Sequence, residues 1–80
     1  MEQIKIEELL PKMNPGYVAC DKDGVWNYYT TKPFMDKDME MWEVDPNYIT
    51  DETEVEVLST IFNIAPAKDW TKSLIKIERK

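Results

Sequence analysis

The sequence contains no histidine and only one cysteine, and these absences limit the chemistry that the chain can perform. Without histidine the chain lacks the commonest general base at neutral pH and a frequent zinc ligand. Cys20 has no second cysteine for an intramolecular disulfide and no histidine to activate it, so we interpret it as a small buried residue of a strand. We therefore expect no enzymatic activity, no catalytic residue, no cofactor and no bound metal.

Long apolar segments and basic residues are also scarce. No apolar run approaches the roughly 18 residues needed to cross a bilayer, and the opening residues MEQIKIEE lack the pattern of a secretory signal. The chain has 10 basic and 16 acidic residues, a net charge of −6, whereas nucleic-acid-binding domains present a basic face. We therefore expect a cytoplasmic protein that binds neither a membrane nor nucleic acid directly.

The 80 residues, of which 42% are hydrophobic, fit a single domain spanning residues 1–80, because no internal repeat, low-complexity tract or long linker divides them. A chain of this size buries only about 60% of the surface that it exposes when unfolded, so its core must be compact. Tryptophan, tyrosine, phenylalanine and methionine supply many of the large side chains for that core.

The clearest local pattern is a pair of strand-like segments around the sequence DKDG. Residues 17–20 and 25–31 are rich in β-branched and aromatic side chains, and Gly24 stands between them where a left-handed backbone is favourable. In an EF-hand loop with Gly24 at position 6, Ala19 and Thr30 would occupy positions 1 and 12, and neither supplies a carboxylate. The pattern therefore predicts a β-hairpin with a tight turn rather than a calcium site.

Side-chain alternation along the second of these strands predicts two apolar faces. Trp26 and Tyr28 point to one face, whereas Tyr29 points to the other. Because both faces carry aromatic rings, we expect both faces of the hairpin to be partly covered.

The two ends of the chain are predicted to form short elements. The apolar spacing of residues 6–13 is typical of a helix, which Pro11 and Pro15 limit to one or two turns. Near the other end, Asp69 has the position of an N-cap for a last element that Trp70 anchors.

The middle of the chain is predicted to contain further strands. Residues 31–33 break the second strand, and residues 35–40 read as a charged connection. Residues 39–44 then alternate as a third strand, which a turn at residues 45–47 closes. Residues 51–64 fit a helix or a strand, and the β-branched alternation within them favours the strand. Together these elements predict an α+β fold, mainly an antiparallel β-sheet of three to five strands with a short N-terminal helix.

Negative charge is concentrated between Asp36 and Glu56, where nine acidic residues and one lysine give a local net charge of −8. One interpretation is a solvated face that keeps a small domain in solution. The alternative is a surface for a basic partner protein, because methionine and aromatic residues typical of interfaces are interleaved with the carboxylates. The candidate partner-binding residues are Asp36, Asp38, Glu40, Trp42, Glu43 and Tyr48.

The motifs in residues 16–75 together resemble those of small proteins encoded by bacteriophages and prophages. The motifs are YVACDKDG at residues 17–24, then Trp26 and Tyr28, then Lys32 and Pro33, then Trp42, and finally DWTKSL at residues 69–74. The resemblance implies a compact, mainly β domain whose DW-x-x-SL ending packs the C-terminus onto the sheet. Such proteins are generally of unassigned function, so the resemblance transfers no catalytic residue.

Phage accessory proteins of this size include inhibitors of host defences, such as anti-CRISPR proteins, which are commonly acidic and non-enzymatic. By this association we expect a protein that acts in a bacterial host and binds and inhibits a host protein, such as a component of a CRISPR effector. Two alternatives stay open: a protein that sequesters a small nucleotide or other ligand in an aromatic-lined pocket, and a structural or assembly component of the virion. The sequence leaves the oligomeric state open as well.

Overall fold

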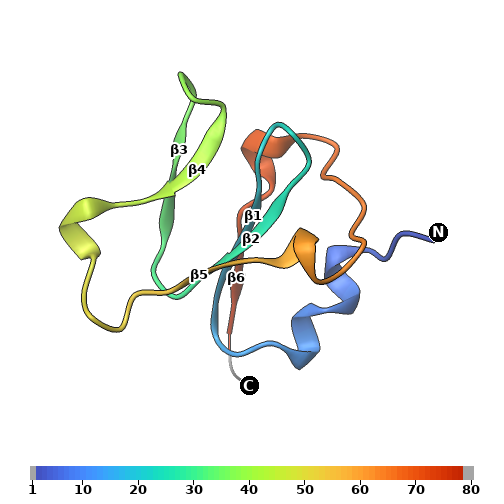
Figure 1. Cartoon of the computed structure of the whole chain (residues 1–80), viewed down its shortest axis with the longest axis horizontal. Coiled ribbons are helices and arrows are strands. Elements are labelled where there is room, and N and C mark those ends of the chain that lie inside the picture. The colour runs from blue at the N-terminus through green and yellow to red at the C-terminus, as the bar shows by residue number, and fades with distance from the viewer. Residues whose placement is uncertain (1, 79–80) are drawn as a thin grey trace.

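The computed structural model describes residues 2–78, in which two antiparallel sheets are connected by loops and short 3-10 helices (Figure 1). The main sheet has the strand order β5-β2-β1-β6, and β3 and β4 form a separate hairpin. The strands are β1 (Gly16–Cys20), β2 (Trp26–Tyr29), β3 (Pro33–Asp36), β4 (Met41–Val44), β5 (Val55–Val57) and β6 (Ile75–Ile77). The 3-10 helices are η1 (Ile6–Glu8), η2 (Leu10–Lys12), η3 (Pro46–Tyr48), η4 (Leu58–Thr60) and η5 (Trp70–Lys72). This arrangement confirms the predicted α+β fold, which is mainly antiparallel sheet.

The β1–β2 hairpin has the turn that DKDG predicts. The Gly24 N–H donates to the Asp21 carbonyl oxygen at 2.9 Å, and the Val25 N–H donates to Asp23 Oδ1 at 3.0 Å. Gly24 has a φ of +90°, a conformation that glycine adopts without a steric penalty. The strands then pair antiparallel, with Cys20 opposite Trp26. The aspartates and the glycine of DKDG therefore shape a turn.

Both faces of this hairpin are covered, as the alternation of its aromatic residues predicts. On one face Trp26 packs in a core with residues of the N-terminal segment, of η4 and of β6. The buried members of that core are Ile6, Val18, Cys20, Trp26, Leu58, Ile64 and Ile77. On the other face Ala19 and Tyr29 pack against Trp42 of β4. Figure 1 shows the β3–β4 hairpin on one side of the β1–β2 hairpin and the N-terminal segment on the other.

The predicted N-terminal helix forms as two consecutive 3-10 turns, η1 and η2. Pro11 lies in the first turn of η2, where its missing N–H removes no helical hydrogen bond. Met13 has extended backbone angles, φ −98° and ψ 153°, so the helix ends there, as expected before Asn14 and Pro15. Ile6 is the buried residue that fixes η1 to the sheet.

The prediction for residues 33–40 was partly wrong. Met35 and Asp36 do not belong to a charged connection, because they complete β3, which begins at Pro33 and pairs with β4. β2 has already ended at Tyr29, and Pro33 starts the next strand, because proline is tolerated as the first residue of a strand. The predicted third strand exists as β4 but begins at Met41, because the turn before it places Glu40 at a φ of +57°.

The C-terminal third contains the two edge strands of the main sheet. Val55–Val57 form β5, which confirms the choice of a strand there, and the chain then turns into η4. Asp69 caps η5 as predicted, since its Oδ1 accepts a hydrogen bond from the Thr71 N–H at 3.0 Å. The following strand β6, which pairs with β1, was not predicted.

Each 3-10 helix within residues 2–78 has three residues. None of them is therefore long and apolar enough to cross a lipid bilayer.

Candidate functional site

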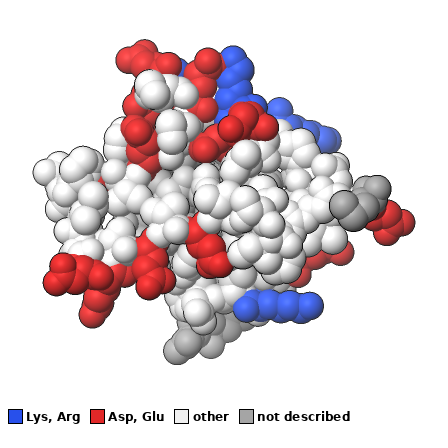
Figure 2. Space-filling view, viewed as in Figure 1, with Lys and Arg blue, Asp and Glu red and all other residues white. Residues whose placement is uncertain are grey.

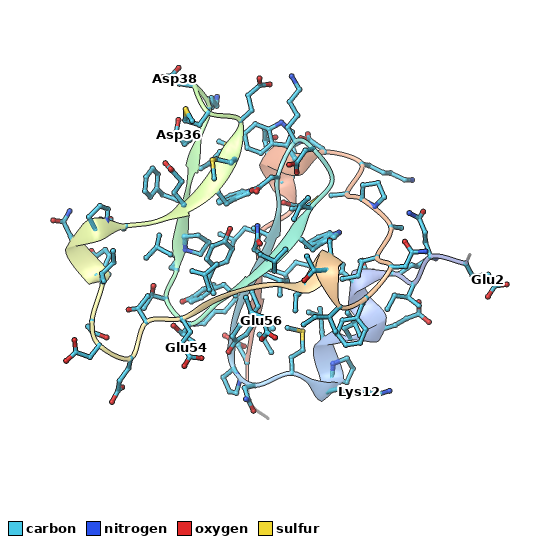
Figure 3. The ribbon with its side chains drawn as sticks, viewed as in Figure 1. Glu2, Lys12, Asp36, Asp38, Glu54 and Glu56 are labelled. Carbon is cyan, nitrogen blue, oxygen red and sulfur yellow. The ribbon has the colours of Figure 1, made fainter. Side chains whose placement is uncertain are left out.

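The fold divides the acidic residues of the segment 36–56 between two regions. One group lies on the β3–β4 hairpin, and the other lies on β5 and the loop before it. In Figure 3 the labelled Asp36 and Asp38 lie at one end of the molecule, far from Glu54 and Glu56 in the view. Figure 2 shows the acidic side chains in separate groups around the rim of this face, with uncharged surface between them. The continuous charge of the sequence therefore becomes two separate surfaces.

The outer face of the β3–β4 hairpin carries most of the candidate residues. The register places Phe34 opposite Glu43 and Asp36 opposite Met41, so these four side chains share the face that points away from the core. Phe34 is 41% exposed despite its size. We call this face, together with the turn residues 37–40, the acidic hairpin surface.

Asp36 and Glu43 are neighbouring carboxyl groups on this surface that share a hydrogen bond. Asp36 Oδ1 accepts hydrogen bonds from the backbone N–H groups of Asp38 and Met39, each at 3.1 Å. These backbone donors, Met39 first, and a hydrogen bond with Glu43 lower the pKa of Asp36. The same contact raises the pKa of Glu43, because its protonated form donates to the neighbouring carboxylate. Asp36 therefore holds its negative charge more firmly than Glu43 does.

Glu40 is bound to the neighbouring hairpin. Its carboxylate forms an exposed ion pair with Lys22, and its carbonyl oxygen accepts a hydrogen bond from the Lys22 N–H at 3.2 Å. The ion pair offsets part of the charge that Glu40 brings to the surface. Asp38 lies on the same turn and is also exposed.

Trp42 is not part of the acidic hairpin surface. Its side chain is 7% exposed and packs against Ala19 and Tyr29. Its Nε1–H donates to the Trp70 carbonyl oxygen at 3.0 Å, and its carbonyl oxygen accepts from the Tyr29 hydroxyl at 3.2 Å. Trp42 therefore attaches the β3–β4 hairpin to the main sheet, and the acidic residues lie on the opposite, outer face of that hairpin.

Tyr48, the last candidate residue, lies on η3 after the hairpin and is 65% exposed. The turn before it is capped by Asp45, whose side chain accepts from the Asn47 N–H at 2.9 Å. Ile49 follows and is 58% exposed, so this end of the molecule presents adjacent aromatic and aliphatic groups.

Asp21 has a structural role that the DKDG pattern does not reveal. The residue is 9% exposed, and its Oδ1 accepts a hydrogen bond from the Trp42 N–H at 2.8 Å. Its Oδ2 accepts from Asn27 Nδ2 at 3.3 Å. Burial raises the pKa of Asp21, although both hydrogen bonds oppose that shift. Nothing in the local sequence distinguishes this carboxylate, which links two hairpins, from the exposed Asp23 of the same turn.

Ser73 makes a similar link at the C-terminal end of β1. Its Oγ accepts from the Cys20 N–H at 2.8 Å and lies 3.0 Å from the Cys20 carbonyl oxygen and 2.7 Å from that of Trp70. The serine of the DW-x-x-SL motif thus binds the backbone of β1. This contact and the pairing of β6 with β1 hold the C-terminal segment on the sheet.

One pocket has Trp26 in its lining. Its volume is about 520 Å³, and apolar side chains of the N-terminal segment and of residues 65–75 line it together with three lysines and two acidic residues: Lys5, Lys68, Lys72, Glu7 and Asp69. The Trp26 side chain, however, is 3% exposed and its Nε1–H donates to the Ala65 carbonyl oxygen at 2.9 Å. The Trp26 ring therefore presents no open face on which a base could stack.

The acidic residues form no metal-binding group in the described part of the chain. Within residues 2–78 no three histidine, cysteine, aspartate or glutamate side chains gather into a group that could hold a metal ion. No protein-family model matches the sequence, and no curated protein or solved structure matches it.

Proposed function

We propose that this protein is a non-enzymatic binding protein that uses the acidic hairpin surface to occupy a basic region of a host protein and inhibit it. The resemblance to phage-encoded proteins supports a component of a bacterial defence system, such as a CRISPR effector, as that host protein. The partner's basic groups face the carboxylates, and its apolar groups contact the exposed rings and methionines.

One observation carries this proposal: the outer face of the hairpin combines carboxylates with exposed apolar side chains. Asp36, Asp38 and Glu43 supply charge, while Phe34 at 41% and Met39 at 64% exposure supply apolar contact area. A purely solvated face has no need of large exposed apolar groups, whereas protein interfaces combine an apolar centre with a polar rim. The buried contacts of Asp21 and Trp42 support this face, so little conformational entropy is lost on binding.

The test begins with affinity capture of the partner from bacterial lysate, followed by titration of the purified pair at several salt concentrations. Two variants with the same change in net charge are compared. The hairpin variant is Asp36→Asn, Asp38→Asn, Glu40→Gln and Glu43→Gln. The control variant neutralises exposed acidic residues elsewhere: Glu2→Gln, Glu7→Gln, Asp51→Asn and Glu52→Gln.

We expect the hairpin variant to bind about ten-fold or more weakly and to lose most of the salt dependence of the association rate. The control variant should retain most of the affinity, because its substitutions lie outside the acidic hairpin surface. Equal affinities of the two variants would contradict the proposed surface, and turnover of a substrate by the purified protein would contradict the non-enzymatic function.

A further inference from the structure

The edge strand β5 is a second surface that the fold leaves open. In the main sheet β5 pairs with β2 on one side only. Every residue of β5 is exposed, with Val55 at 50% and Val57 at 40%. Two exposed β-branched side chains on a paired strand indicate that no other part of residues 2–78 covers this edge.

The phase of the β2–β5 ladder shows which backbone groups of β5 are open. The Thr30 N–H donates to the Glu54 carbonyl oxygen at 3.2 Å, so this pair is hydrogen-bonded. Bonded and non-bonded pairs alternate in an antiparallel ladder, and therefore Glu56 directs its N–H and C=O toward Tyr28. Val55 and Val57 direct theirs away from the sheet. The Thr60 hydroxyl donates to the Val57 carbonyl oxygen at 2.8 Å, which leaves both valine N–H groups and the Val55 carbonyl facing outward.

The side chains beside this open edge alternate in chemical character. Val55 and Val57 lie opposite Tyr29 and Asn27, on the face that the β3–β4 hairpin partly covers. Glu56 lies opposite Tyr28 on the other face, and Figure 3 shows Glu54 and Glu56 extending from the same side of the ribbon. A strand added to this edge therefore meets valines on one face and carboxylates on the other.

A groove on the carboxylate face lies next to Glu56. Its volume is about 210 Å³, and its lining includes Lys12, Tyr28, Glu56, Ile61 and Phe62. Ile61 is 56% exposed and Phe62 is 40% exposed, so the groove has an accessible apolar wall. At the Glu56 end of the groove a lysine or arginine can cover apolar groups with its methylene stem while its charged end reaches the carboxylate, whereas Lys12 in the same lining disfavours a basic group that extends further in.

Charge decides which strand can occupy the edge. In a symmetric antiparallel pairing with a second copy of this chain, Glu56 faces Glu56 or Glu54 of the other copy when Val55 pairs with Val57 or with Val55. The remaining register, Val57 with Val57, places Glu56 opposite Leu58, where β5 has ended and η4 begins. Like charges directly opposite one another destabilise a strand pair, and carboxylates on an edge strand protect it against self-association. A strand with basic residues at alternate positions turns the same carboxylates into attractive contacts.

We propose that β5 binds an extended segment of another protein by β-strand addition, with lysine or arginine facing Glu54 and Glu56 and aliphatic residues facing Val55 and Val57. The valine N–H and C=O groups that point outward form the new ladder. This site is separate from the acidic hairpin surface and does not depend on the proposed function.

Fluorescence anisotropy with labelled peptides tests the proposal. The probe is acetyl-KIKIKIK-amide, and acetyl-KKIIKKI-amide is a control of equal composition and charge in which no more than two successive residues alternate. We expect the alternating peptide to bind about ten-fold or more tightly than the control, because only its basic and aliphatic residues reach the correct faces together. Equal binding of the two peptides would overturn the proposal and indicate charge attraction alone.

Amide exchange measured by NMR locates the bound peptide. The Val55 and Val57 amides should exchange more slowly when the alternating peptide is bound, whereas the Glu56 amide, already paired with β2, should change little. Protection elsewhere without protection of the two valines would overturn the site. A concentration-dependent dimer of the free protein that protects the same valines would replace the proposed partner with a second copy.

Charge reversal provides a readout that misfolding cannot imitate. In Glu56→Lys the alternating lysine peptide should lose affinity by about ten-fold or more, and the peptide acetyl-EIEIEIE-amide should gain it. Asp38→Lys, which makes the same charge change on the hairpin turn, should leave the preference for the lysine peptide intact. If Asp38→Lys weakens binding as much as Glu56→Lys does, the peptide is not seated on β5 and the proposal fails.

Discussion

Removing the Asp21 carboxylate tests whether a buried side chain holds the β3–β4 hairpin against the main sheet. Asp21→Ala deprives the Trp42 N–H and the Asn27 side-chain amide of their acceptors, which lie at 2.8 and 3.3 Å. Leaving a buried donor unsatisfied costs roughly 1–3 kcal/mol, so with two donors the free energy of unfolding should fall by about 2–6 kcal/mol. Small domains are stable by only about 5–15 kcal/mol, and this loss is therefore a large fraction of the total.

Two further variants separate the hydrogen bonds from the shape of the turn. Asp21→Asn keeps an oxygen that can accept from the Trp42 N–H but places an amide against Asn27, so its loss of stability should be intermediate. Asp23→Ala changes the same residue type in the same turn, where the side chain is exposed and accepts from the Val25 N–H. Its cost should be about 1 kcal/mol or less. Urea unfolding followed by tryptophan fluorescence measures all three, and equal losses for Asp21→Ala and Asp23→Ala would refute the reasoning.

The pH dependence of the Asp21 variant has a defined sign. Burial, with the nearby charge of Asp23, raises the pKa of Asp21 in the folded protein above its value in the unfolded chain. Between those two pKa values the folded state binds more protons, so the free energy of unfolding decreases as pH rises and then levels off above the folded pKa. The pKa values of Asp36 and Asp69 are lowered in the folded protein, so these two groups make the free energy of unfolding rise with pH. They do so in wild type and in Asp21→Asn alike, and their effect cancels in the difference. The stability of wild type minus that of Asp21→Asn should therefore fall with rising pH across this window, and a difference that rises would contradict the assignment.

The remaining predictions concern close packing around β1. A Cβ at Gly16 would lie 2.7 Å from both the Tyr28 hydroxyl oxygen and the Tyr29 carbonyl oxygen. Because the carbonyl belongs to the paired backbone, Gly16→Ala should destabilise the protein by about 1–3 kcal/mol, seen as a lower midpoint in thermal unfolding; an unchanged midpoint would mean that the strand shifts freely. Cys20 is 1% exposed and burial raises the pKa of its thiol, so a thiol reagent should label it slowly in buffer and quickly in urea. Fast labelling without urea would place Cys20 at an accessible position.

The elements that sequence analysis predicted well are those specified by neighbouring residues. The DKDG turn needs an aspartate and a left-handed glycine within a few residues, and Gly24 adopts that conformation. The Asp69 cap likewise depends on a donor two residues away. β6 was missed although Ile75 and Ile77 alternate with Lys76, because this alternation spans only three residues and the pairing with β1 joins residues that are distant along the chain.

The candidate site was predicted only in part for the same reason. Alternation correctly assigned Trp42 and Glu43 to opposite faces of β4, but it did not show which face would be covered. Docking of the hairpin through Asp21 buries Trp42, which was proposed for the binding surface. It leaves Phe34 exposed, although phenylalanine side chains were expected in the core.

By itself the sequence determined the acidic charge, the absence of histidine chemistry, the central hairpin and the alternation of its side chains, since each depends on composition or on short-range spacing. Only the tertiary structure decided that the acidic segment divides between the β3–β4 hairpin and β5, and that β5 keeps an open edge. The physical reason is that burial and strand order result from contacts between distant parts of the chain. The same carboxylate is a buried link at Asp21 and a solvated charge at Asp23, according to what packs against it.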